Sequence, residues 1–354
     1  MANNIGFGKI YDSTWWGNGV TDNSISWGIT YKDLAGSDDF IITVKTDNAG
    51  TSADNQFTIP TSTSGITQAF LYDIETSDGQ SITGLTGNHT ITFPSAGEYE
   101  VKISGSFPYM YFNNGGDKLK ILDIKNLGIY ALGSTRQVSA FYGCSNMTIT
   151  ATDSGNFENV TTFSTGFNGA WRNCSSLTSF PQIDTSSGTN FFGAWLNCSS
   201  LTSFPQIDTS SGTNFNSAFS LCSSLTSFPL LDFSNGTNFD NAWNSCNSLT
   251  SFPLIDTSSG TIFNSTWRNC TSLANFPSNV FDTSPATNYL SAFSATNLTT
   301  QSIDDILVSL DTSGVSNGTF TQSGGQAPSA TGEAAIDSLV GKGWTITVTG
   351  GYTP

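Results

Sequence analysis

The chain has 354 residues, 37% hydrophobic and 12% aromatic, which is enough apolar material for a sizeable core and for two or three domains. Only 11% of the residues are charged, and 27 acidic against 11 basic side chains give a formal net charge of −16. A binder of bare nucleic acid or of anionic membranes is therefore disfavoured, since both need clustered lysine and arginine.

The first 36 residues set aromatic side chains among glycines, in the run IGFGKIYDSTWWGNGVTDNSISWGITY. One interpretation is a small β-hairpin packed on the next domain. The other is an anchoring segment, because tryptophan and tyrosine carry much of the energy of protein interfaces. The GFG…WWG…WG pattern resembles short N-terminal segments of tailed-phage structural proteins, which implies anchoring to other virion proteins through Phe7, Trp15, Trp16, Trp27 and Tyr31.

Two targeting features are missing from the sequence. Its start has neither the basic n-region nor the apolar h-region of a secretory signal. No stretch reaches the roughly 18 consecutive apolar residues of a membrane-spanning helix. We therefore expect no export signal and no membrane span.

Residues 37–110 contain strand-like runs such as FIITVKT, QFTIP and YEVKIS, separated by turns rich in Gly, Asn and Asp. The run YDIETSDGQSITGLTGNHTITFPSAGEYEVKISG resembles a PKD-type domain, which implies a β-sandwich. His89, the one histidine of the chain, lies at the His-Thr step of this pattern. No base–nucleophile pair surrounds it, so we expect a structural role.

Residues 111–298 carry the strongest pattern. After an entry segment that includes KLKILDIKNLGIYAL, a phrase of 24 residues recurs from Cys174 to Cys270. The eighteen residues from Cys174 through Phe191 return letter for letter from Cys198 to Phe215. A fixed period in this range predicts a solenoid, in which each coil buries its aromatic face against its neighbours.

One coil reads as a strand, a turn, a short helix and a second turn. Phe191, Ala194, Trp195 and Cys198 lie at i, i+3, i+4 and i+7, which is the spacing of one helix face. The pattern C-x-x-L-x-x-F-P-x-x-D-T-S-x-G-T-N-F-x-x-A-W resembles BspA-like leucine-rich repeats, although tryptophan stands where those repeats commonly have phenylalanine. The resemblance implies a right-handed solenoid with a parallel strand ladder, in a non-enzymatic protein that binds surfaces.

Stacked coils would align equivalent residues in ladders. The aromatic ladder could be an exposed sugar-binding stripe, but its spacing with Ala and Cys favours core. The regular cysteine spacing favours buried, reduced thiols over metal ligands or disulfides, although oxidation stays open. These structural ladders comprise Cys174, Cys198, Cys222, Cys246 and Cys270 with Trp171, Trp195, Trp243 and Trp267.

Two polar rows are expected on the outside of the coils. Asp184, Asp208, Asp232, Asp256 and Asp282 open a turn, where we expect them to accept backbone N–H bonds as Asx-turns do; a calcium ladder is the alternative. A row of hydroxyls would bind glycans by weak repeated contacts, or be a solvated surface without a ligand. This candidate ligand face comprises Thr178, Ser179, Thr202, Ser203, Thr226, Ser227, Thr250 and Ser251.

After Leu298 the period ends, and residues 299–354 read as two helices and a last strand that cap the stack. The whole chain is therefore predicted to be mostly β with short helices: a β-sandwich domain followed by a right-handed α/β leucine-rich-repeat solenoid with a C-terminal cap.

The function expected from these patterns is that of a non-enzymatic phage virion structural protein, an appendage, fibre or capsid decoration. It would assemble in the host cytoplasm, be exposed outside the cell, be multicopy or homo-oligomeric, and contact other virion proteins and a host glycan or protein. Neither a cofactor nor a metal is expected. The alternatives are a bacterial cell-surface adhesin of the BspA-like class and a phage glycan depolymerase acting through paired carboxylates.

Overall fold

The computed structural model describes residues 38–64, 69–131, 136–155, 157 and 166–354. Asp39–Pro354 form one compact unit. The anchoring role predicted for residues 1–36, with Phe7, Trp15, Trp16, Trp27 and Tyr31, falls outside the described residues.

The N-terminal part of this unit is built from two sheets. The larger has the order β4-β3-β6-β1-β7-β8, and the smaller pairs β2 with β5. The strands are β1 (Phe40–Lys45), β2 (Gln56–Ile59), β3 (Leu71–Thr76), β4 (Ser81–Leu85), β5 (His89–Thr92), β6 (Glu98–Ser106), β7 (Ile121–Asn126) and β8 (Thr148–Ile149).

Side chains alternate between core and surface along β3 and β6, as strand geometry requires, whereas Ile42, Thr43 and Val44 of β1 are all buried. In β1, Ile42 and Val44 are fully buried, and in β6 Val101 and Ile103 are too. Phe57 of the small sheet belongs to the same buried cluster. One core therefore lies between the two sheets.

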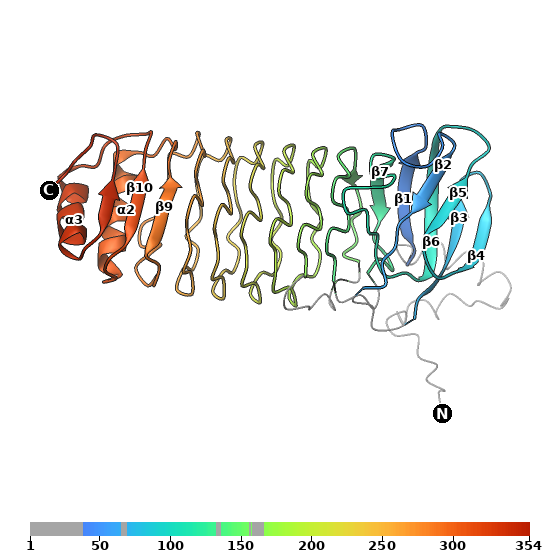
Figure 1. Cartoon of the computed structure of the whole chain (residues 1–354), viewed down its shortest axis with the longest axis horizontal. Coiled ribbons are helices and arrows are strands. Elements are labelled where there is room, and N and C mark those ends of the chain that lie inside the picture. The colour runs from blue at the N-terminus through green and yellow to red at the C-terminus, as the bar shows by residue number, and fades with distance from the viewer. Residues whose placement is uncertain (1–37, 65–68, 132–135, 156, 158–165) are drawn as a thin grey trace, which may run out of the picture. The chain divides into compact units, whose positions relative to one another are not determined.

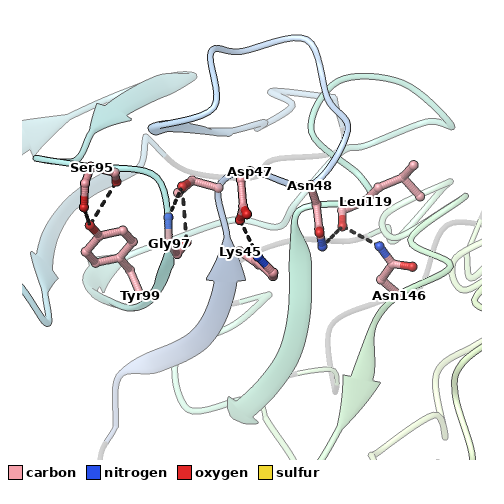
Figure 2. A network of polar contacts seen from close by, with 9 residues as sticks. Lys45, Asp47, Asn48, Ser95, Gly97, Tyr99, Leu119 and Asn146 are labelled. Carbon is pink, nitrogen blue, oxygen red and sulfur yellow. Dashed lines mark hydrogen bonds and ion pairs between the residues drawn. The ribbon is translucent and has the colours of Figure 1, made fainter.

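The larger sheet continues past residue 110 into the region of the coils. β7 pairs antiparallel with β1 on one side and parallel with β8 on the other. The carbonyl of Leu119 accepts hydrogen bonds from Asn48 at 3.0 Å and from Asn146 at 2.7 Å, which ties the loop after β1 to the first coils (Figure 2). The sandwich and the coils thus share one sheet.

Each later coil begins with a ribbon of turns. In the ribbon 190–197, the N–H groups of Ala194 and Leu196 bond to carbonyls three residues earlier. Gly193 and Asn197 have φ of 56° and 62°, in the left-handed region. The same conformation recurs in the following ribbons at Ser217, Leu221, Asn241, Ser245, Ser265 and Asn269.

This alternation turns every second N–H toward the next coil. The N–H groups of Phe191, Gly193, Trp195 and Asn197 donate to carbonyls one coil later, at 2.8–2.9 Å. The pattern recurs from the coil at 166–189 to the coil at 262–287, so a continuous hydrogen-bond ladder joins the coils that precede β9 in Figure 1.

The prediction of an α/β leucine-rich-repeat solenoid is wrong. Across the described part of the 24-residue coils there is neither a helix nor a continuous strand ladder, only turns and isolated bridges such as Asn190 with Asn214. Helices are described only near the C-terminus. The coarser expectation of a mostly β chain holds.

Helix and strand do alternate in the last segment: β9 (Asn288–Phe293), α2 (Thr300–Thr312), β10 (Thr319–Gln322), α3 (Ala330–Gly341) and β11 (Thr345–Thr347). Its three strands are parallel, in the order β11-β10-β9. Thr299 caps α2 and Ser329 caps α3, each accepting a backbone N–H. Because Ser302 and Ser309 of α2 bond to the coil at 262–287, this segment covers the end of the stack.

Candidate functional site

The inside of the coils is an aromatic column. Trp195, Trp243 and Trp267 have no exposed surface, and Trp171 is only 2% exposed. Trp243 stacks on Phe219 at 5.9 Å and on Trp267 at 5.8 Å, and edge-to-face phenylalanines flank the column. These rings are closed off from solvent, so they form core, as their spacing predicts, and not an exposed sugar-binding stripe.

The cysteines lie beside this column. All six are free and buried. From Cys174 to Cys270, each thiol in the ladder donates to a backbone carbonyl 27 residues or more earlier, at 3.2–3.3 Å. Burial raises the pKa of all six thiols, that of Cys222 and Cys270 to about 12. The thiols therefore stay protonated, and the five from Cys174 to Cys270 act as hydrogen-bond donors between coils.

Because a thiolate is the reactive form of cysteine, the folded chain should resist thiol reagents. We expect none of the six cysteines to react with Ellman's reagent in the native protein, and all six to react after unfolding in guanidinium under reductant-free conditions. Fast reaction of a native thiol would contradict the buried ladder.

The predicted ligand face lies on the outside of the coils, where its eight threonines and serines are all exposed. The hydroxyl of Thr202 donates to the carbonyl of Thr178 at 3.2 Å, and Thr226 and Thr250 repeat this bond. Three of the four threonine protons are thus used within the stack, while their oxygens can still accept. A ligand that binds these three threonines must bring its own donors.

A second threonine row escaped the sequence reasoning. The hydroxyls of Thr213, Thr237 and Thr261 donate to the carbonyls of Thr189, Thr213 and Thr237, at 3.0–3.1 Å. These three threonines are exposed. The repeated Gly-Thr-Asn/Ile step at the coil boundary was the available signal.

The aspartates act as predicted in four coils. Asp184, Asp208, Asp232 and Asp256 each accept the N–H of the residue two positions later, at 2.8–2.9 Å, which confirms the Asx-turns. Asp282 instead accepts the hydroxyl of Ser309. No group of three or more His, Cys, Asp or Glu side chains suited to a metal occurs within the described ranges, so nothing there supports the calcium alternative.

On the outer side of the turn ribbons, one position holds asparagine in three of five successive coils. The sequence did not lead us to predict this row. The row holds Asn168, Phe192, Asn216, Asp240 and Asn264, at one position of successive coils, and all are half-buried. Asp240 accepts from the amides of Asn264 at 2.9 Å and Asn216 at 3.4 Å, in the coils on either side. Within these five coils Phe192 and Asp240 are the two departures from asparagine, and these departures were the only sequence signal.

A buried ionic cluster joins the sandwich to the first coil. Asp117 and Lys120 are each 1% exposed. Asp117 accepts the N–H groups of Thr51, Ser52 and Thr58 at 2.7–3.0 Å. The Lys120 ammonium donates to the carbonyls of Ser52, Ala53 and Gln56 at 2.8–3.1 Å.

The hydroxyl of Ser52 links the two charges, since Lys120 lies 2.9 Å from it and it lies 2.6 Å from Asp117. Burial alone would raise the pKa of Asp117, but hydrogen bonds from Ser52 and Thr58 and the charge of Lys120 outweigh it and lower this pKa. A Cβ at Gly50 would lie 2.5 Å from the carboxylate, so glycine lets the loop approach. Both charged side chains are buried, so they serve the fold.

Of the helices in the described ranges, none combines the length and apolar character needed to cross a bilayer. Comparison of the chain with models of protein families, with curated proteins and with solved structures found no match.

Proposed function

We propose that this chain is a non-enzymatic structural protein of a phage virion, anchored through residues 1–36, that displays its coils for adhesion to surface glycans or proteins. The observation that carries the proposal is the repetition of the same exposed polar side chains once per coil around an interior that is closed by aromatic rings. Such an array suits weak contacts made many times over, because linked sites gain avidity without new contacts.

Two further observations support this proposal. All six cysteines are free, which suits folding in a reducing cytoplasm before release, as virion proteins fold. The coils also carry few charges, and the net charge of −16 disfavours anionic surfaces as targets. A secreted adhesin would instead fold where thiols are oxidised.

The adhesive face is tested by replacing Thr178, Thr202, Thr226 and Thr250 together with lysine. We expect binding of the full chain to intact host cells to fall about tenfold or more, since the long charged side chains block close approach. The control replaces Thr213, Thr237 and Thr261 with lysine, which adds three positive charges to the other threonine row. Equal binding by the first variant and the wild type would remove this face from the proposal.

The virion location is tested separately. Particles purified from the producing cells are examined by mass spectrometry and cryo-electron microscopy, with wild-type chain and with a chain lacking residues 1–36. We expect the full chain on the particle and loss of the shortened one. A full chain that is absent from every particle would overturn the virion part of the proposal.

A further inference from the structure

The row of asparagines on the turn ribbons is interrupted at two places. Equivalent positions hold Asn168, Asn216 and Asn264, but Phe192 and Asp240 stand in the second and fourth of these coils. The backbone bonds of the ribbons are the same in all of them, so the scaffold requires neither residue. Because the fold does not require Phe192 or Asp240 on this half-buried face, these two residues are candidates for ligand binding.

Asp240 is a carboxylate with unused accepting capacity. Its Oδ1 accepts the amides of Asn241 and Asn264, both at 2.9 Å, whereas its Oδ2 has one long bond of 3.4 Å to Asn216. Within the described part of the chain, no lysine or arginine forms an ion pair with it. A half-buried carboxylate of this kind favours a ligand that donates O–H or N–H groups.

Phe192 offers the complementary apolar surface. It is half-buried, and no aromatic ring among the described residues packs on it, whereas its neighbour Phe191 stacks with Phe167 and Phe215. The buried rings of Phe191, Phe215 and Phe239 are 5.3 and 5.6 Å apart from one coil to the next. Phe192 and Asp240 are two such steps apart along the row, a separation that a short oligosaccharide spans.

We propose that the row from Phe192 to Asn264 is a carbohydrate-binding site. The apolar C–H face of a sugar ring would pack on Phe192, and hydroxyls of a sugar further along the same oligosaccharide would donate to Asp240, with Asn216 and Asn264 holding the carboxylate in place. The net charge of −16 favours neutral or amino sugars over uronic or sialic acids. The site rests on the proposed adhesive function and gives it a ligand class.

Two substitutions test the site without disturbing the stack. Phe192→Asn and Asp240→Asn each place at the row the residue that Asn168, Asn216 and Asn264 already have, so both variants should fold as the wild type does. The full-length chain, fluorescently labelled, is applied to an array of neutral, amino-sugar and uronic-acid oligosaccharides, and the affinity for a bound sugar is measured by calorimetry.

We expect the wild type to bind neutral or amino-sugar oligosaccharides, and each variant to lose about tenfold or more in affinity: Asp240→Asn through the loss of a hydrogen bond to a charged group, and Phe192→Asn through the loss of the aromatic surface under the sugar. The Thr213, Thr237 and Thr261 lysine variant, changed on another row, should bind as the wild type. Variants that bind as well as the wild type, or binding of acidic sugars alone, would overturn the site.

The result is separable from the test of adhesion. If the array is silent while the chain still binds host cells, or if binding depends on a cell-surface protein, the carbohydrate site is wrong and adhesion stands. If neither the array nor the cells are bound, both proposals fail.

Discussion

Replacing Asp117 with asparagine should lower the free energy of unfolding at pH 7 by about 3–5 kcal/mol, because it leaves the buried Lys120 without its counter-charge. The variant also turns an amide N–H₂ toward donors that now bond a carboxylate, namely the N–H of Thr58 and the hydroxyl of Ser52. Urea unfolding followed by circular dichroism measures the change. Since both charged side chains are almost fully buried, solvent screens the lost interaction only weakly.

The effect should depend on pH with a definite sign. The pKa of Asp117 is lower in the folded chain than its ordinary value of 3.8, so its charge stabilises the fold above that value. This stabilisation is lost as the pH falls through the lower folded pKa. The difference between the wild type and the variant should therefore be constant from pH 5 upward and shrink below about pH 3.8.

A surface pair provides the control. Lys125 and Glu100 form an ion pair of 3.0 Å, but their side chains are 47% and 45% exposed. Glu100→Gln should cost less than about 1 kcal/mol. In the double variant Asp117→Asn/Lys120→Met the penalty should be smaller than the sum of the two single ones, because no unpaired charge stays buried. Equal costs for Asp117→Asn and Glu100→Gln would show that the cluster is not closed to water.

The period of 24 residues predicted which residues would meet, but not how the backbone would run. Phe191, Ala194, Trp195 and Cys198 are buried side by side as a helix face would be, because a chain of turns repeats with a similar spacing. The chain of turns differs from a helix in its left-handed φ at Gly193 and Asn197, which points alternate N–H groups out of the coil. Glycine and asparagine tolerate that conformation, but later coils hold it with Ser217, Leu221, Ser245 and Ser265, so the sequence carried only a partial signal.

The sites that the sequence did not reveal depend on long-range contacts. Asp117 and Lys120 meet a loop that lies about sixty residues earlier in the chain, and nothing in the local spacing joins them. Asp240 differs from the asparagines of its row only in having a carboxylate oxygen in place of the amide nitrogen. Its position opposite Asn216 and Asn264 becomes visible only once the register of neighbouring coils is known.

The tryptophans of the aromatic column contribute apolar ring contacts, but their indole N–H groups are a cost to stability. Trp195, Trp243 and Trp267 each bury an Nε1–H that has no hydrogen-bond partner among the described residues, at a cost of about 1–3 kcal/mol for such a group. Phe219 fills the same place in its coil without that cost. The column therefore tolerates phenylalanine where it now has tryptophan.

Trp243→Ala should lower the free energy of unfolding by about 3–5 kcal/mol, since the cavity removes stacking on Phe219 and Trp267 and the edge contacts of Phe228 and Phe252. Trp243→Phe should stay within about 1 kcal/mol of the wild type or exceed it, because the smaller void is offset by removal of the orphan N–H. Urea unfolding of the two variants gives both values.

Leu254 is the matched control, because it lies in the same coil but is 54% exposed. Leu254→Ala should change stability by less than about 0.5 kcal/mol. If Trp243→Phe costs as much as Trp243→Ala, then the indole N–H has a bonding partner, such as an internal water, and the column is not dry. If Trp243→Ala costs no more than Leu254→Ala, the coils are held by their hydrogen-bond ladder and not by the rings. A stack held by apolar ring contacts requires that Trp243→Ala lowers the free energy of unfolding strongly and that Trp243→Phe does not lower it.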